Sequence, residues 1–186
     1  MYKICQTEQS SLRQRALEKG FLELLQKQSY EDISISDLCA HLQIPRKTFY
    51  RYFSHKDGIL YSMIDHTLVD FFSTPLVEKK YRGTGADELQ LFFAFWYKNK
   101  AFLDALEHSH LSGILVERAN VLSLQEGYMP RQFKSMPPDS QDLVMAFSVC
   151  GLMSMVLRWH HQGFLLSPEE MSSLAIKLLT APLLNP

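Results

Sequence analysis

Positive charge and aromatic rings are concentrated in residues 46–56, which read RKTFYRYFSHK. This stretch holds four Lys or Arg side chains and four aromatic rings but no carboxylate, although the whole chain carries a net charge of −1. Lys and Arg side chains bind phosphates, and in the major groove of DNA they also donate hydrogen bonds to guanine. On a nearly neutral chain, such a stretch predicts a localised contact with an anion.

The spacing within this stretch separates an inner face from an outer face. Phe49 and Phe53 lie four residues apart, so on a helix they share a face that should pack inward. The cations and Tyr50 then point toward solvent or a groove. Lys56 falls in the first turn of the next predicted helix, where the helix dipole disfavours a cation unless an anion such as phosphate is bound there.

The elements that would position these residues are helices. Apolar residues recur every three or four positions, and the paired alternating runs of a β-hairpin are missing. The predicted helices are 9–28, one opening at Ser34, one from Pro45 or Arg46 to Tyr52, 55–72, 87–99, one through Phe102 to Leu106, 111–124, one from Asp139 or Ser140 to Trp159, and one from Ser167 to Thr180. Polar residues at 82–85 and 127–140 predict connections. The sequence therefore predicts an all-α fold of about nine helices.

Composition limits the remaining classes of function. The chain has 186 residues, of which 46% are hydrophobic and 21% charged, as expected for a soluble protein of one or two domains. No apolar run reaches the roughly 18–20 residues of a membrane span, and the first residues lack a signal peptide, so we expect a cytoplasmic protein with no membrane partner. No hydrolase, phosphate-loop or zinc-protease motif occurs, so we expect neither an enzyme nor a cofactor.

Two further groups of residues have competing interpretations. The pairs His108 with His110 and His160 with His161 lack the four-residue spacing of a helical metal site, so no metal site is predicted. Three cysteines without paired spacing also argue against a disulfide framework. The aromatic residues of 92–97 fit either a packed core or the lining of a ligand pocket.

Residues 33–60, ISISDLCAHLQIPRKTFYRYFSHKDGIL, resemble the N-terminal DNA-binding domain of the tetracycline-repressor (TetR/AcrR) family of bacterial regulators. The segment TFYRYFSHKDGIL matches the family pattern Thr-aromatic-Tyr-x-aromatic-Phe-x-x-Lys-x-x-Leu, with Tyr50 and Lys56 as its anchors. The resemblance covers roughly residues 9–65, and residues 151–179 more loosely resemble the last two helices of the family. Gln43 stands where the family usually has Gly, and Pro45 stands where it usually has Ser or Thr.

The resemblance implies two domains and a function. Residues 1–54 are expected to form a three-helix helix-turn-helix DNA-binding domain, and residues 55–186 a helical ligand-binding and dimerisation domain. The implied protein is a homodimeric, sequence-specific transcriptional repressor whose binding to a palindromic double-stranded DNA operator is modulated by a small-molecule effector. The alternative is a protein of similar fold that acts through a partner protein, with weak or indirect DNA binding. The departures at Gln43 and Pro45 keep this alternative open.

The residues expected to contact DNA lie on the two short helices and at the start of the next. Those expected to approach bases are Arg46, Lys47 and Tyr50, and those expected to hold phosphates are Ser34, Ser36, Thr48, Arg51, Tyr52 and Lys56. One short helix contacts few base pairs, so two copies should bind half-sites about 34–36 Å apart or at a multiple of that distance.

The remaining expectations concern the body of the protein. Aromatic and methionine side chains of the middle helices predict an incompletely filled apolar site for a neutral or aromatic effector. Its expected lining is Phe92, Phe95, Trp96, Phe102, Leu103, Leu106, Leu115, Met145, Val149 and Met153. Helices at 140–161 and 167–180 are the expected dimer seam. The apolar residues to be shared between seam and core are Val149, Leu152, Met153, Val156, Leu174 and Leu178.

Overall fold

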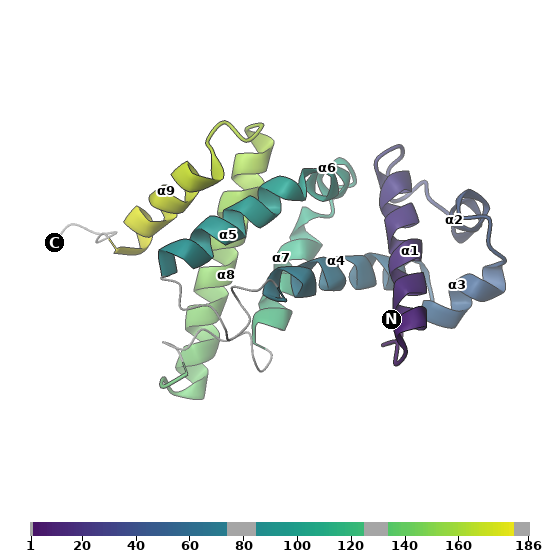
Figure 1. The fold of residues 1–186 in the computed structure, drawn as a ribbon, viewed down its shortest axis with the longest axis horizontal. Coiled ribbons are helices and arrows are strands. Elements are labelled where there is room, and N and C mark those ends of the chain that lie inside the picture. Colours follow the sequence, from purple (N-terminus) through teal and green to yellow (C-terminus); the bar gives the residue numbers. More distant parts are fainter. Residues whose placement is uncertain (1, 74–84, 125–133, 181–186) are drawn as a thin grey trace. The chain divides into compact units, whose positions relative to one another are not determined.

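The computed structural model describes residues 2–73, 85–124 and 134–180 (Figure 1). In these ranges the chain forms nine α-helices and no β-strand, which confirms the predicted all-α class. The helices are α1 (Glu8–Leu25), α2 (Ile35–His41), α3 (Arg46–Tyr52), α4 (Lys56–Phe72), α5 (Gly85–Lys98), α6 (Lys100–His108), α7 (Ser112–Ser123), α8 (Pro138–His161) and α9 (Pro168–Thr180). Residues 82–84 of the predicted turn and 127–133 of the predicted loop lie outside the described residues, whereas 138–140, also predicted as loop, begin α8.

Side-chain caps begin two of the helices where the sequence predicts them. Ser34 caps α2, because its Oγ accepts from the Asp37 amide at 3.1 Å while the Asp37 carboxylate accepts from the Ser34 amide at 2.9 Å. These bonds from Ser34 lower the pKa of Asp37. Ser167 and Glu170 exchange the equivalent pair of bonds, of 3.2 and 2.7 Å, at the start of α9.

The start of α8 differs from the prediction. The N-cap is Pro137, which makes no side-chain cap bond, and the helix begins at Pro138, so the predicted cap at Asp139 or Ser140 is wrong. A proline at the first helical position lacks only an N–H that would have no partner within the helix. The end of α8 follows the prediction, because Gly163 adopts φ 70° directly after the C-cap.

The chain divides into two compact units that alternate along the sequence. The first consists of Met1–Thr67 and Ala101–Arg118, and the second of Leu68–Lys100 and Ala119–Pro186. The helices α4 and α7 each begin in the first unit and end in the second. The domain boundary predicted after residue 54 stays a prediction.

The core of the first unit forms beneath the two short helices. Phe49 and Phe53 are 0% and 1% exposed, and their ring centroids lie 5.3 Å apart, which confirms their predicted inward face. Gly20 on α1 permits a close approach of α2. A Cβ atom at this position would lie 2.2 Å from Cδ2 of Leu42, at the end of α2. The helix-turn-helix is therefore packed tightly on α1.

The core of the second unit is largely aromatic. Phe93, Trp96 and Trp159 are buried, and the ring centroids of Phe93 and Trp159 lie 5.8 Å apart. Figure 1 shows α5 lying beside α9. Gln90 on α5 donates to Glu169 on α9 at 3.3 Å, so a polar contact supplements the packing of these two helices.

The turn between α2 and α3 holds a residue other than Gly in a left-handed conformation, since Gln43 has φ 52°. Such a conformation costs an L-residue about 1–2 kcal/mol, whereas Gly adopts it freely but loses about 0.5–1 kcal/mol more chain entropy on folding. We therefore expect Gln43→Gly to raise the free energy of unfolding by up to about 1 kcal/mol. Gln43→Val should lower it, because β-branched residues tolerate this region least. Urea unfolding measures the stability of both variants. A Gln43→Val protein more stable than the Gln43→Gly protein would contradict backbone strain at this position.

Candidate nucleic-acid interface

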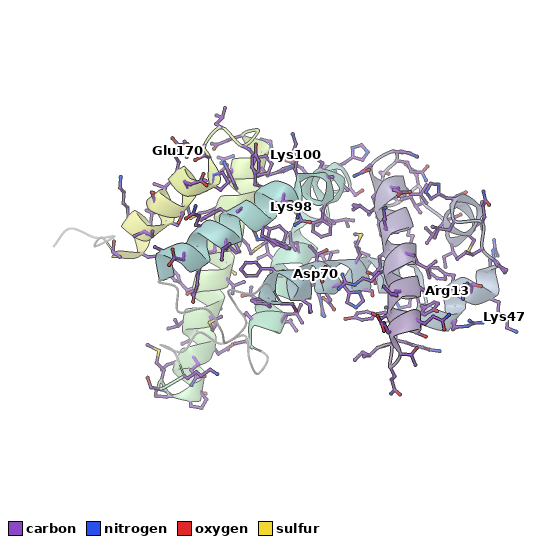
Figure 2. All side chains as sticks on the ribbon, in the orientation of Figure 1. Arg13, Lys47, Asp70, Lys98, Lys100 and Glu170 are labelled. Atoms are coloured by element: carbon purple, nitrogen blue, oxygen red, sulfur yellow. The ribbon has the colours of Figure 1, made fainter. Side chains whose placement is uncertain are left out.

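The predicted base-contacting residues lie together on the outer surface of α3. Arg46 and Lys47 are exposed, and Tyr50 keeps 49% of its surface exposed. Figure 2 shows Lys47 on the outer side of the helix. Arg51 is exposed in the last turn, and the α3 sequence RKTFYRY contains no acidic residue. One short helix therefore presents cations and a phenol without a competing carboxylate.

Contacts between α2 and α3 involve two of the predicted residues. The Arg46 guanidinium Nη2 donates to Oγ of Ser36, so these side chains from different helices are neighbours on the surface. The Ser34 hydroxyl is also exposed, but it donates to the Asp37 carboxylate at 2.5 Å and accepts from the Asp37 amide. Ser34 thus caps α2, whereas Ser36 orients Arg46.

Two of the predicted phosphate ligands, Tyr52 and Thr48, are buried or half-buried rather than exposed. Tyr52 is 4% exposed, and its ring lies against Phe53 at a centroid distance of 6.2 Å. Its side chain therefore belongs to the core, and this burial gives no support to the expected phosphate contact. Thr48 is half-buried, and its amide donates to the carbonyl oxygen of Pro45 at 2.8 Å in the first turn of α3.

Lys56 is bound to the connection between α1 and α2. Its Nζ donates to the carbonyl oxygen of Tyr30 at 2.7 Å and lies 4.2 Å from the centroid of the Tyr30 ring. The Tyr30 phenol in turn donates to Asp57, and burial together with this bond raises the pKa of Tyr30, so the phenol stays protonated. A carbonyl oxygen and a ring thus offset the dipole conflict that the sequence raises for Lys56.

A polar network that the sequence does not predict is centred on Asp65 of α4. The Asp65 carboxylate is buried and accepts two bonds from the Arg118 guanidinium, both of 2.6 Å, and one of 2.5 Å from the Tyr2 phenol. The bond with Asp65 raises the pKa of Arg118, and burial followed by the same carboxylate raises the pKa of Tyr2. The three residues come from distant parts of the sequence, so no local spacing signals the network.

A second buried network joins α1 to α4. Gln14 Nε2 donates to Ser62 Oγ at 2.7 Å, and Ser62 Oγ donates to Glu18 Oε1 at 2.5 Å. His66 Nδ1 lies 2.8 Å from the same carboxylate oxygen. Without these bonds, the buried polar groups would lower the stability of the fold. The bonds also fix α1 to α4.

The residues predicted to line an effector site are divided between the two units. Phe102, Leu103, Leu106 and Leu115 lie in the first unit, and Phe92, Phe95, Trp96, Met145, Val149 and Met153 lie in the second. On α5, Trp96 has ring-centroid distances of 6.3 Å to Phe92 and 5.3 Å to Phe95. The structure thus brings the aromatic residues of the second unit together into one cluster.

The described ranges hold no cluster of side chains suited to binding a metal ion and no disulfide. No group of three or more His, Cys, Asp or Glu side chains that could hold a metal ion occurs there. Cys5, Cys39 and Cys150 are free thiols, and burial raises the pKa of Cys39. The surface of α2 and α3 is therefore the strongest candidate site in this part of the chain.

Comparison with protein families points to the same helices. Residues 20–63 match the family described as "Bacterial regulatory proteins, tetR family". The HTH-type dhaKLM operon transcriptional activator DhaS of Lactococcus lactis subsp. lactis is 27% identical over 95 residues, which are 51% of this chain and 49% of that protein. The uncharacterized HTH-type transcriptional regulator YxbF of Bacillus subtilis is 39% identical over 56 residues, 30% of this chain and 15% of that protein. The alignments thus span half or less of these relatives.

Solved structures share the fold over most of the chain. The dihydroxyacetone kinase operon activator DhaS has a TM-score of 0.61 at 21% identity, covering 90% of this chain and 94% of its own. The TetR family repressor AlkX from Dietzia sp. strain DQ12-45-1b gives 0.58 at 15% identity, covering 89% and 92%. The fatty acid degradation regulator FadR from Bacillus halodurans gives 0.57 at 14% identity, covering 94% and 97%.

Proposed function

We propose that this chain, which belongs to the tetR family of bacterial regulatory proteins, binds a two-fold symmetric operator as a homodimer and changes its DNA affinity in response to a small molecule. The observation that carries the proposal is the outer surface of α3, where Arg46, Lys47 and Arg51 are exposed with no acidic residue on the helix. In this proposal, α3 enters the major groove and α2 lies against the phosphate backbone.

Variants of α3 test the DNA contact. We expect Arg46→Ala and Lys47→Ala each to weaken operator binding by about 1–3 kcal/mol and to relax specificity at one base pair, because each removes a donor to a base edge. Fluorescence anisotropy on a palindromic duplex from the chain's own upstream region measures the affinity. Lys100→Ala, an exposed cation on α6, is the matched control. Unchanged affinity in both α3 variants would contradict the assignment.

Two further variants make this experiment specific. Ser36→Ala removes the partner of Arg46 but keeps the cation, so it separates lost orientation from lost charge. Lys56→Ala tests a phosphate contact only when unfolding is measured as well, because Lys56 also binds the Tyr30 carbonyl oxygen. We expect Lys56→Ala to weaken binding to all DNA sequences similarly and to lower stability.

The dimer is supported by exposed apolar side chains on α8 and α9 of the second unit. On α8, Leu143 and Phe147 are 72% and 66% exposed, and on α9, Leu174 and Leu178 are 41% and 44% exposed. By length and composition alone α8 could also cross a membrane, and only 17% of its most apolar window is buried, so much of its apolar surface is left for a partner to cover. We assign these four exposed side chains, Leu143, Phe147, Leu174 and Leu178, to an interface with a second copy of the chain.

Other residues of α8 agree with that assignment. Gly151 is exposed, and no heavy atom lies within 4 Å of the Cβ position at this residue, so a partner helix has room to approach. Met153 and Val156 are 2% and 0% exposed, which places them in the core of the unit rather than on the shared face. Of the residues expected to be shared between seam and core, Met153 and Val156 thus belong to the core, whereas Leu174 and Leu178 are exposed.

The effector site is proposed for the second unit, around the aromatic cluster of α5. Phe92 and Trp96 are buried there, and Met145 and Met153 are buried on α8. Such a lining suits a neutral apolar ligand. AlkX, which shares this fold, is implicated in biodegradation of n-alkanes, so n-alkanes are the first neutral apolar compounds to test. FadR, which also shares the fold, is a fatty acid degradation regulator. DhaS, in contrast, is named for a dihydroxyacetone kinase operon.

Trp96 provides a direct readout of ligand binding. In a Trp159→Phe background it is the remaining tryptophan, so its emission can be followed alone. We expect n-decane to change this emission and to change operator affinity by about 5- to 150-fold, the range of an allosteric coupling of 1–3 kcal/mol. A response to dihydroxyacetone alone would contradict the apolar ligand class.

The regulatory output is proposed to be repression. AlkX is a repressor, whereas DhaS is an activator, so relatives of this fold act in both directions. A reporter driven by the chain's own upstream region should increase when the gene is deleted. Binding of the purified chain to this DNA without other proteins separates the proposal from action through a partner protein.

A further inference from the structure

The segment that precedes α1 is fixed to α3, α4 and α1 by one contact each. The Lys3 amide donates to the carbonyl oxygen of Tyr52, the last residue of α3, at 3.0 Å. The Tyr2 phenol donates to Asp65 at 2.5 Å, and Cys5 Sγ lies 2.8 Å from Oε1 of Gln14. Residues 2–5 therefore run past the end of α3 in a defined position.

The backbone pairing of this segment determines the direction of its side chains. Tyr2 and Phe53 form an isolated antiparallel bridge, so their side chains lie on the same side of the paired backbones. Phe53 is buried and Tyr2 reaches inward to Asp65. In extended backbone the next side chain points to the opposite side, and Lys3 is accordingly exposed.

Lys3 adds a cation at the C-terminal end of α3. The exposed Arg51 comes directly before Tyr52, whose carbonyl oxygen binds the Lys3 amide. The C-terminal end of a helix carries partial negative charge, which favours a cation and repels a phosphate. A recognition helix in the major groove has backbone phosphates beside its ends, so a lysine at this end offsets that repulsion.

We propose that Lys3 is a further phosphate ligand of the DNA-binding surface, and that Tyr2 is the residue that positions it. This inference rests on the proposed DNA binding by α3. The hydrogen bond from Tyr2 to Asp65 anchors the segment to α4, and the bond from the Lys3 amide anchors it to α3. The backbone that carries Lys3 is thus preorganised, which reduces the entropy lost on binding.

Salt dependence tests the role of Lys3. One phosphate contact contributes about 0.9 to the slope of log affinity against log salt, so Lys3→Ala should weaken binding about 15-fold at 50 mM salt and about fourfold at 200 mM. The loss should be equal for operator and unrelated duplexes. The control Lys100→Ala should match the wild type at both salt concentrations. The chain is used with no residues added before Met1.

A double-mutant cycle tests the role of Tyr2. Tyr2→Phe removes the donor to Asp65 but keeps the ring, and it should weaken DNA binding in the wild-type background without changing the salt slope. In the Lys3→Ala background the same substitution should have no further effect on affinity. An equal loss in both backgrounds would show that Tyr2 acts only on folding and would overturn its positioning role.

The outcomes separate this inference from the proposed function. If the wild type binds the operator with a salt-dependent affinity and Lys3→Ala keeps both affinity and slope, Lys3 is not a ligand and the inference fails alone. If the wild type binds neither operator nor unrelated DNA at 50 mM salt, the proposed DNA binding fails, and the inference fails with it.

Discussion

Asp65→Ala is expected to lower the free energy of unfolding by about 3 kcal/mol. The substitution removes the carboxylate that accepts three hydrogen bonds. The Arg118 guanidinium and the Tyr2 phenol then lose this acceptor. Breaking a buried ion pair by removing one partner costs about 3–5 kcal/mol. We expect the lower end because the Arg118 side chain is 26% exposed and can regain water contacts, whereas the Asp65 side chain is 3% exposed. Urea unfolding followed by circular dichroism measures the change.

Two companion variants show whether the unpaired charge causes the loss. Asp142→Ala removes an exposed carboxylate from α8 and should change stability by less than about 0.5 kcal/mol. Asp65→Leu combined with Arg118→Met removes both charges and should recover much of the stability lost on changing Asp65 alone. An Asp65→Ala protein as stable as the Asp142→Ala control would contradict the importance of the network.

Phe147→Asp is expected to separate the dimer. Phe147 is 66% exposed in the single chain, so the substitution removes little from the core of the unit. In a two-fold interface the same change occurs twice and places two like charges in an apolar contact. We expect the variant to sediment as a monomer at micromolar concentration, where the wild type is a dimer. Operator affinity should fall about 100-fold or more, because the second half-site is no longer bound by a linked copy.

A control of equal exposure is available in the first unit. Leu12 on α1 is 64% exposed, so Leu12→Asp introduces the same charge on a comparable side chain away from the proposed face. This variant should remain dimeric in sedimentation velocity. If Phe147→Asp still forms dimers and keeps its operator affinity, the interface lies on another surface.

Features encoded by neighbouring residues could be predicted from the sequence. The cap formed by Ser34 and Asp37, the start of α3 after Pro45 and the stop at Gly163 each depend on residues within one helical turn. The inner face of α3 also followed from the four-residue spacing of its two phenylalanines. The cap of α8 was missed because consecutive prolines begin that helix without a side-chain bond.

Features that depend on distant residues could not be predicted in this way. The partners of Asp65 lie 53 and 63 residues away, and an acid in a mostly apolar helix gives no local sign of them. The burial of Tyr52 was missed because the helical period alone does not determine how far a core extends around a short helix. The same limit applies to α8, where periodicity gives an apolar stripe but not which apolar residues a partner covers.

The spacing of the two half-sites most directly tests whether a two-fold dimer binds DNA through α3. Titration of the purified chain against its palindromic operator should give two chains per duplex. Inserting five base pairs between the half-sites rotates them by about half of a 10- to 10.5-base-pair turn. We expect the affinity then to fall to that of a duplex with one half-site. An affinity unchanged by the insertion, or equal for one half-site and two, would contradict a two-fold dimer that binds DNA through α3.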